Sequence, residues 1–335
     1  MNKSVLYVTT PGALVAQNHG RLRVTKGKEL LQEVRIFDIE RVVVLGGSAG
    51  LTSTAATALM EAGIECAFLS SAGVFRGFLA PAKGRGAALR LAQYEAYLSP
   101  ERRLEIARKI VARKIKNSDT MLSRYARNHP EFDAKREQDR LFAAQYATSN
   151  AVSTESLMGF EGEAAAAYFA AFGRMLGGGF HFKERSKRPP RDPANALLSF
   201  GYTLLSSEAT SAVAGAGLDP AIGMLHSLAE GRPSLALDLM EPFRTAVVDR
   251  LVLHIANRRL LSPLDDFTSD LDNGPRLSDS ARRKFLMAYE ERMTETFTRG
   301  RSEKTTCLRE CLRAEAYSLA HSLRDGTVFR PFVLP

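Results

Sequence analysis

The spacing of apolar residues changes once along this chain, at the Pro-, Gly- and basic-rich segment PAKGRG of residues 81–86. Before it, short strand-like runs are separated by turn signals such as Pro11-Gly12, at the spacing of hairpins. After it, apolar residues recur three and four positions apart, as a helix facing a core requires. We therefore predict an α+β protein, with an antiparallel β-rich domain over residues 1–85 and a mostly α-helical domain over residues 86–335.

Length and composition limit the classes to which the protein can belong. The chain has 335 residues, 45% of them hydrophobic, which is enough to bury the cores of about two domains. No apolar run is long enough to span a bilayer, and polar residues interrupt the first ten positions, where a signal peptide needs a continuous apolar stretch. Three cysteines form no disulfide framework. We expect a cytoplasmic protein without a membrane partner.

The excess of basic residues indicates a polyanionic partner. Lys and Arg number 46 against 37 acids, for a net charge of +9, and many cluster in a predicted helix over residues 102–116 and a loop over residues 183–191. Asp192 before Pro193 predicts that a helix begins directly after this loop. Simple solvation of these residues is the alternative. The candidate DNA-contacting residues are Arg108, Lys109, Arg113, Lys183, Arg185, Lys187, Arg188 and Arg191.

The stretch IGMLHSLAEGRPSLALDLMEPFR, residues 222–244, places a histidine and acids in apolar surroundings. Residues 235–240 predict a buried helix, on which Asp238 and Glu241 share one face. A turn at residues 231–234 would allow His226 to return over that face, and one imidazole with two carboxylates suits a hard metal ion. The alternative is a core histidine followed by an amphipathic helix whose acids face water.

Glu161 is a further ligand candidate. It lies in an alanine-rich predicted helix between Gly159 and Gly162, which weaken a helix and are expected where a backbone or a ligand approaches closely. The alternative is a surface glutamate in the first turn of the helix, favoured there by the helix dipole.

Three segments taken together, LMGFEGEAAAAYF, RPPRDPANALLSFGYTLL and GLDPAIGMLHSLAEGRPSLALDLMEPFR, resemble the CRISPR-associated integrase of the spacer-acquisition module, CRISPR-associated protein one. Order, spacing and character agree across roughly 90 residues. The opening LYVTTPGALV is also similar to that family, so the resemblance covers most of the chain. The pattern of the basic, proline-rich segment resembles that of the type I-C branch.

The resemblance implies an N-terminal β-sandwich domain that dimerises and docks partners, followed by a helical catalytic domain that depends on Mg²⁺ or Mn²⁺. Carried onto this sequence, the implied metal ligands are Glu161, His226 and Glu241, where some relatives carry Asp at the last position. Asp238 matches a further acidic position of the motif, which we expect to accept a hydrogen bond behind the ligands or to hold a bound water.

The implied function is that of a DNA integrase and endonuclease in antiviral defence. It would insert foreign DNA fragments into a CRISPR array by attack of a DNA 3′-hydroxyl on a phosphodiester. The implied partners are double-stranded protospacer and repeat DNA, a second copy of the chain, and the small companion protein of the adaptation complex. Two alternatives remain open: a stand-alone metal-dependent nuclease on branched DNA, and a non-enzymatic basic DNA-binding protein.

Overall fold

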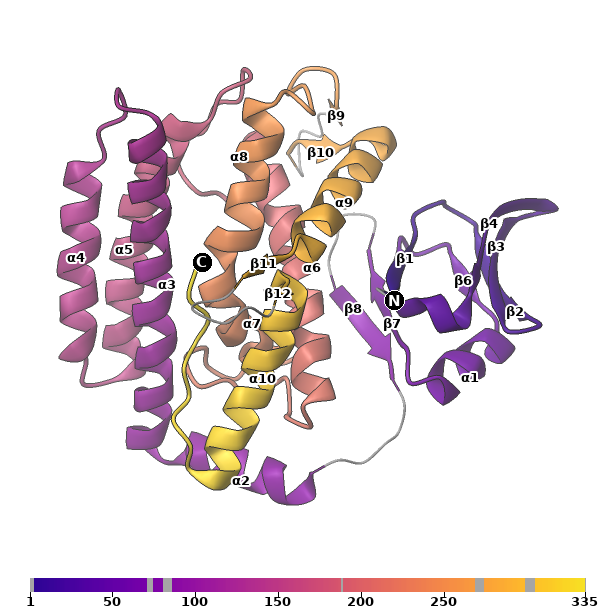
Figure 1. Ribbon diagram of the computed structural model, residues 1–335, viewed down its shortest axis with the longest axis horizontal. Coiled ribbons are helices and arrows are strands. Elements are labelled where there is room, and N and C mark those ends of the chain that lie inside the picture. The colour runs from indigo at the N-terminus through magenta and orange to yellow at the C-terminus, as the bar shows by residue number, and fades with distance from the viewer. Residues whose placement is uncertain are drawn as a thin grey trace. The chain divides into compact units, whose positions relative to one another are not determined.

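The structure is a computed structural model that describes residues 3–70, 75–80, 86–187, 189–268, 274–298 and 305–334. The chain forms two compact units, Met1–Arg85 and Gly86–Pro335 (Figure 1). Strands dominate the first unit and helices the second, so the predicted α+β class is confirmed.

The first unit contains two four-stranded sheets and one helix. One sheet has the order β1-β5-β7-β8 and the other β4-β3-β2-β6. Side chains of both sheets and of the helix pack into one core, which includes Val15, Val42 and Leu59, all fully buried. The elements are β1 (Ser4–Val8), β2 (Leu14–Asn18), β3 (Arg21–Lys26), β4 (Glu29–Arg35), η1 (Ile36–Asp38), β5 (Ile39–Leu45), β6 (Gly50–Leu51), α1 (Ser53–Glu61), β7 (Glu65–Leu69) and β8 (Phe75–Leu79).

The pairing of these strands is mixed, which corrects the prediction of an antiparallel domain. Strands β2, β3 and β4 pair antiparallel, as the hairpin spacing indicates. Strands β1, β5 and β7 run parallel, with Leu6 opposite Val42 and Val42 opposite Cys66. Strands β2, β3 and β4 lie between β1 and β5 in the chain, and β6 and α1 lie between β5 and β7. Connections of this length return the chain in the same direction, as parallel pairing requires.

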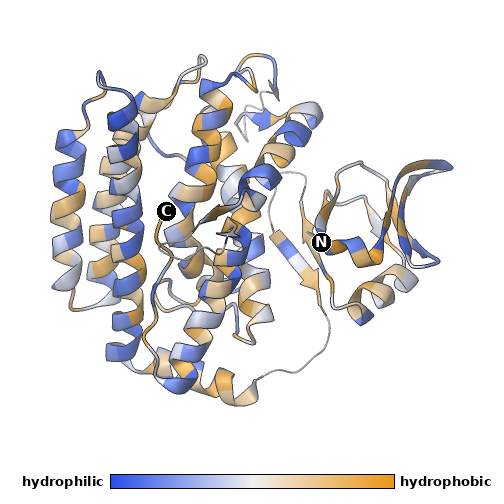
Figure 2. Ribbon diagram, viewed as in Figure 1, coloured by the Kyte–Doolittle hydropathy of each residue, from blue (hydrophilic) through white to orange (hydrophobic). Residues whose placement is uncertain are grey.

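The second unit is helical. Helix α6 is buried on nearly all sides, and α3, which mixes hydrophilic and hydrophobic residues (Figure 2), packs against α4 and α5. None of the helices in the described ranges is both long and apolar enough to cross a membrane. The main helices are α2 (Ala87–Leu98), α3 (Pro100–Asn128), α4 (Lys135–Ser149), α5 (Thr154–Met175), α6 (Pro193–Gly215), α9 (Asp279–Thr294) and α10 (Leu308–Asp325). This unit also contains two short antiparallel strand pairs: β9 (Phe267–Thr268) with β10 (Arg276–Leu277), and β11 (Phe297–Thr298) with β12 (Thr305–Thr306).

Residues 234–257 form one continuous but irregular helical run. The predicted buried helix is confirmed as α7 (Ser234–Met240). A 3₁₀ turn, η2 (Glu241–Phe243), and a π-helical segment, η3 (Thr245–Asp249), follow before α8 (Arg250–Asn257) restores the regular pitch. Pro242 lacks an N–H group, so a regular α-helix cannot continue through it. The change of pitch turns successive side chains in directions that α-helical spacing does not predict.

Candidate active site

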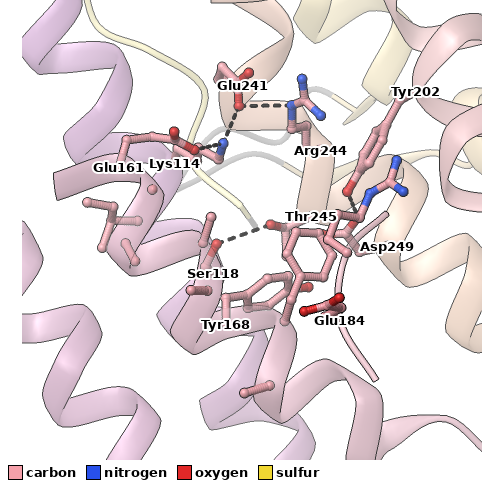
Figure 3. Close-up of a pocket in the computed structure, with 18 of the residues that line it drawn as sticks. Lys114, Ser118, Glu161, Tyr168, Glu184, Tyr202, Glu241, Arg244, Thr245 and Asp249 are labelled. Atoms are coloured by element: carbon pink, nitrogen blue, oxygen red, sulfur yellow. Dashed lines mark hydrogen bonds and ion pairs between the residues drawn. The ribbon is translucent and has the colours of Figure 1, made fainter. Parts of the chain in front are cut away.

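A cavity of about 500 Å³ lies among α3, α5, α6 and the irregular run. Glu161, His226 and Glu241, the three residues implied as metal ligands, all line it, whereas Asp238 is fully buried behind His226. Figure 3 shows Glu161 and Glu241 reaching from different helices towards the ammonium of Lys114. The tertiary structure thus brings together residues that lie far apart in the sequence.

Glu161 projects from the interior of α5. The helix begins at Thr154 and the acid of its first turn is Glu155, so the first-turn interpretation of Glu161 is wrong. Its carboxylate accepts a hydrogen bond from Lys114. Apart from the adjacent residues and backbone of α5 itself, no described atom lies within 4 Å of the position that a Cβ would take at Gly159 or Gly162. Close approach of another backbone therefore does not explain the two glycines.

Glu241 opens the 3₁₀ turn after α7 and is 4% exposed. Its Oε2 atom lies 2.5 Å from Nζ of Lys114 and 2.8 Å from Nε of Arg244. Burial by itself would raise the pKa of this carboxyl, but Arg244, Lys114 and His226 lower the pKa to about 2. The carboxylate is therefore ionised and already surrounded by positive charge.

Lys114 is the residue of this site that the sequence analysis assigned elsewhere, to a basic surface. Its side chain on α3 is 16% exposed, and its ammonium pairs with both Glu161 and Glu241. Burial acts to lower the pKa of Lys114, but the two carboxylates outweigh it and the net pKa is raised. The signal that could have identified Lys114 is its position next to Ile115, which belongs with Ala107 and Val111 to the buried apolar face of α3.

His226 lies in the loop between α6 and α7, and Asp238 fixes its orientation. Oδ1 of Asp238 accepts from the backbone N–H of His226 at 3.0 Å and from its ring Nδ1 at 2.7 Å. Oδ2 accepts from the N–H groups of Met224, at 2.5 Å, and Leu225, at 2.9 Å. Because Nδ1 donates to a carboxylate, the neutral ring presents Nε2 as an acceptor, the form in which histidine binds metals.

These contacts correct one expectation and confirm another. The turn before α7 does bring His226 back over the helix, as expected. However, Asp238 and Glu241 do not present their carboxylates to the same space, because α7 ends at Met240 and Glu241 starts a tighter turn. Asp238 acts as the hydrogen-bond acceptor behind the cavity, which was one of its two expected roles.

Two further residues hold the histidine loop in place. Nε of Arg103, on α3, donates to the carbonyl of Met224 at 2.9 Å. Gly223 packs so closely that a Cβ there would lie 2.8 Å from Ser234 and 3.0 Å from the carboxylate of Asp238. Only glycine allows the loop backbone to approach α7 at this distance.

The far end of the cavity is lined by a buried polar cluster of Tyr168, Tyr202, Thr245 and Asp249 (Figure 3). The hydroxyl of Tyr202 donates to Asp249, and the guanidinium of Arg244 lies 4.5 Å from the Tyr202 ring. Burial raises the pKa of Asp249 to about 6, although the two tyrosine hydroxyls and Arg244 act to lower the pKa. The sequence analysis missed this cluster, because the π-helical pitch that orients Thr245 and Asp249 leaves no periodic signal.

Several basic side chains of α3 form hydrogen bonds or ion pairs within the protein, although the sequence predicted a surface that contacts phosphates. Arg108 donates to the carbonyls of Thr148 and Ala151, at 3.1 and 2.9 Å, and Lys109 pairs with Glu105 on its own helix at 2.6 Å. We therefore remove Arg108 from the proposed DNA-contacting set. Lys109 and Arg113 stay in it as half-buried members.

The basic loop over residues 183–191 likewise contains both residues held within the protein and exposed ones. Arg185 donates to Asn195 at 2.7 Å and to Ser199 at 3.0 Å, so it fastens the loop to α6 and is also removed from the set. Lys183 and Lys187 are exposed and line the cavity. Arg191 is exposed and lies 3.1 Å from Glu184, whereas Arg188 lies outside the described residues.

The donor atoms suit a divalent metal ion. Two carboxylates from different helices already surround a cation, and His226 Nε2 has no role in the contact with Asp238. Within the described ranges, no three His, Cys, Asp or Glu side chains form a ready metal-binding group, and the Lys114 ammonium lies between two of the candidates. Carboxylate oxygens with one imidazole match the preferences of Mg²⁺ and Mn²⁺ once that ammonium withdraws.

Comparisons with known proteins place the chain in a family. The family model described as CRISPR associated protein Cas1 matches residues 6–291. A CRISPR-associated endonuclease Cas1 of Thermus thermophilus is 38% identical over 333 residues, covering 98% of this chain and 97% of the relative.

Solved structures give the same assignment. A casposase bound to its integration product has a TM-score of 0.87 at 25% identity, covering 100% of this chain and 94% of the casposase chain. A Cas1 protein from Thermotoga maritima has a TM-score of 0.84 at 27% identity, covering 98% of this chain and all of that structure. The chain belongs to the family of CRISPR-associated Cas1 endonucleases and integrases.

Proposed function

We propose that this protein joins DNA ends by metal-dependent transesterification, inserting captured fragments into a CRISPR array. The observation that carries the proposal is the grouping of Glu161 and Glu241 around one cation, in a cavity that His226 also lines. The likeness to a casposase bound to its integration product supports joining as well as cutting.

Glu161, Glu241 and His226 would hold Mg²⁺ or Mn²⁺, which when bound would ease formation of the 3′-alkoxide and balance charge on phosphorus. Asp238 holds the histidine ring through Nδ1, which would leave Nε2 available to bind the ion. The attacking 3′-oxygen would form a P–O bond while the bond to the departing 3′-oxygen of the array strand breaks. The attacking hydroxyl gives up its proton to solvent and the departing oxygen takes one up, so one 3′-hydroxyl is consumed and another released. One phosphodiester thus replaces another, and no external energy source is needed.

The cations around the cavity would guide DNA to it. Lys183 and Lys187 are exposed at its lining and would contact backbone phosphates without reading bases. Lys109, Arg113, Arg188 and Arg191 complete the proposed set. We further propose that the protein works as a homodimer with the small companion protein, through the β-rich unit over residues 1–85.

The test is a joining assay with purified protein, a short duplex, a supercoiled plasmid carrying the array, and Mn²⁺ or Mg²⁺, with and without the companion protein. We expect plasmid-linked duplex from the wild type and none from Glu161→Ala or His226→Ala, with duplex binding changed by no more than a few-fold. Glu163→Ala is the matched control, because Glu163 is exposed on the same helix and does not line the cavity.

The same assay separates the two alternatives. Cut strands without joined product would identify a stand-alone nuclease, which shares the site but uses water in place of the 3′-hydroxyl. Wild-type joining by both alanine variants would remove the catalytic assignment. Binding with no chemistry under any condition would favour a DNA-binding protein.

A further inference from the structure

The cavity holds its own counter-ion. Lys114 reaches from α3 to a point between Glu161 on α5 and Glu241 on η2, and contacts both carboxylates. The side chains of Lys114 and Glu241 are 16% and 4% exposed. A cation in this position neutralises the charge of the two carboxylates, as a divalent ion would.

The charges of the four side chains that pair around Glu241 and Glu161 balance. Glu161 and Glu241 contribute two negative charges, and Lys114 and Arg244 contribute two positive ones. An entering divalent ion would therefore leave an excess of two positive charges in a poorly solvated space, close to the Lys114 ammonium. Like charges at this distance repel strongly when burial limits screening.

The ion pairs that Lys114 and Arg244 form with Glu241 differ in how easily the cation can move away. Arg244 is three residues from Glu241 in the same helical run, and its guanidinium also rests over the Tyr202 ring at 4.5 Å. Lys114 carries a flexible four-carbon stem on a separate helix, and its ammonium is a point charge without a fixed hydrogen-bonding plane. Lys114 is therefore the cation that can leave the carboxylates.

We propose that Lys114 is a further catalytic residue: its ammonium holds Glu161 and Glu241 together before metal binds, is displaced by the divalent ion, and then contacts the phosphodiester. The inference rests on the proposed function. The phosphate of the substrate would be the anion that compensates for the charge excess, because the proposed reaction takes place at this site. The displaced ammonium can then neutralise a non-bridging oxygen as charge develops.

The experiment is a calorimetric titration of Mn²⁺ into the full-length wild type, Lys114→Met and Lys116→Met, without DNA. Lys116 is the matched control because it is exposed on the same helix, pairs with Asp119 at 2.9 Å and does not line the cavity. Removing the competing ammonium should tighten Mn²⁺ binding at least about tenfold in Lys114→Met, the scale on which one neighbouring charge shifts a buried equilibrium. The control should bind as the wild type does.

Strand transfer at saturating Mn²⁺ tests the second half of the proposal. Lys114→Met should join DNA at least about tenfold more slowly than the wild type, despite its tighter metal binding, because one charge facing the phosphate is gone. Should Lys114→Met unfold without metal, Lys114→Gln replaces it, since its amide can still donate to a carboxylate while carrying no charge. Lys114→Gln should also bind Mn²⁺ more tightly and join DNA more slowly than the wild type.

The possible failures are distinguishable. Unchanged or weaker Mn²⁺ binding by the Lys114 variants would overturn the counter-ion role, and wild-type joining at saturating Mn²⁺ would overturn the contact with phosphate. The proposed function fails separately, if Glu161→Gln and Glu241→Gln bind Mn²⁺ as tightly as the wild type.

Discussion

Asn117 donates a hydrogen bond from Nδ2 to the carbonyl of Pro242, the residue that follows Glu241, at 2.7 Å. The same side chain donates to the carbonyl of Phe332 at 3.0 Å and accepts from the N–H of Leu334 at 3.1 Å. One buried amide on α3 therefore ties the C-terminal segment to the turn that carries a proposed metal ligand.

We predict that Asn117→Ala lowers the free energy of unfolding by about 1–3 kcal/mol, because it leaves buried backbone groups without partners. Chemical denaturation measures this, with the exposed Asn150→Ala as control. Joining should slow as well, since the turn at Glu241 loses a support. Equal stability of the two variants would show that the amide does not hold the segment.

Asp238 and Glu241 should behave differently when each is replaced by its amide in a Mn²⁺ titration of strand transfer. Glu241→Gln should lose nearly all activity at any Mn²⁺ concentration, because a proposed ligand is gone. Asp238→Asn should keep a rate about ten- to a hundredfold below the wild type that rises with Mn²⁺, since a residue orienting a ligand acts indirectly. The reverse pattern would exchange the two roles.

Gly223→Ala should impair both stability and joining. Its Cβ would lie 2.8 Å from Ser234 and push the loop of His226 away from Asp238. Gly215→Ala is the matched control, because nothing lies within 4 Å of its Cβ and alanine favours a helix. A thermal melt in which both variants match the wild type would contradict the close packing.

The pH dependence of stability should depend on Asp249. Its pKa is raised from 3.8 to about 6 on folding. Between these values the folded chain holds a proton that the unfolded chain has lost, so stability falls as the pH rises through this range. Asp249→Asn should thus become more stable relative to the wild type from about pH 4 to pH 6, by up to about 3 kcal/mol. Denaturation at several pH values measures the difference, and a difference that stays constant from pH 4 to pH 6 would contradict the raised pKa of Asp249.

Exposed cations at the cavity should set the salt dependence of DNA binding. The double variant Lys183→Ala and Lys187→Ala should weaken binding to all sequences and flatten the logarithmic salt slope by up to about two units. Lys135→Ala, on the exposed side of α4, serves as control. An identical slope in the double variant would place the basic loop away from DNA.

Local sequence signals determined the elements of this protein that depend on neighbours in the chain. Asp192 accepts from the N–H of Asn195 at 2.7 Å, as expected of the residue before a helix that begins at Pro193. The apolar run over residues 235–240 is a buried helix, and the turn before it returns His226 to that helix. Each depends on dihedral preferences and spacing within a few residues, which a sequence displays directly.

Only the tertiary structure decided which charged groups meet. Lys114 and Arg108 belong to the same basic stretch, yet one lies between two carboxylates and the other caps backbone carbonyls of a neighbouring helix. The partner of Lys114 at Glu161 is 47 residues away, and no periodicity records which faces of α3 and α5 will pack together. The pairing of long, flexible charged side chains follows from that packing, because burial makes an unpaired charge costly and selects the partner that is within reach.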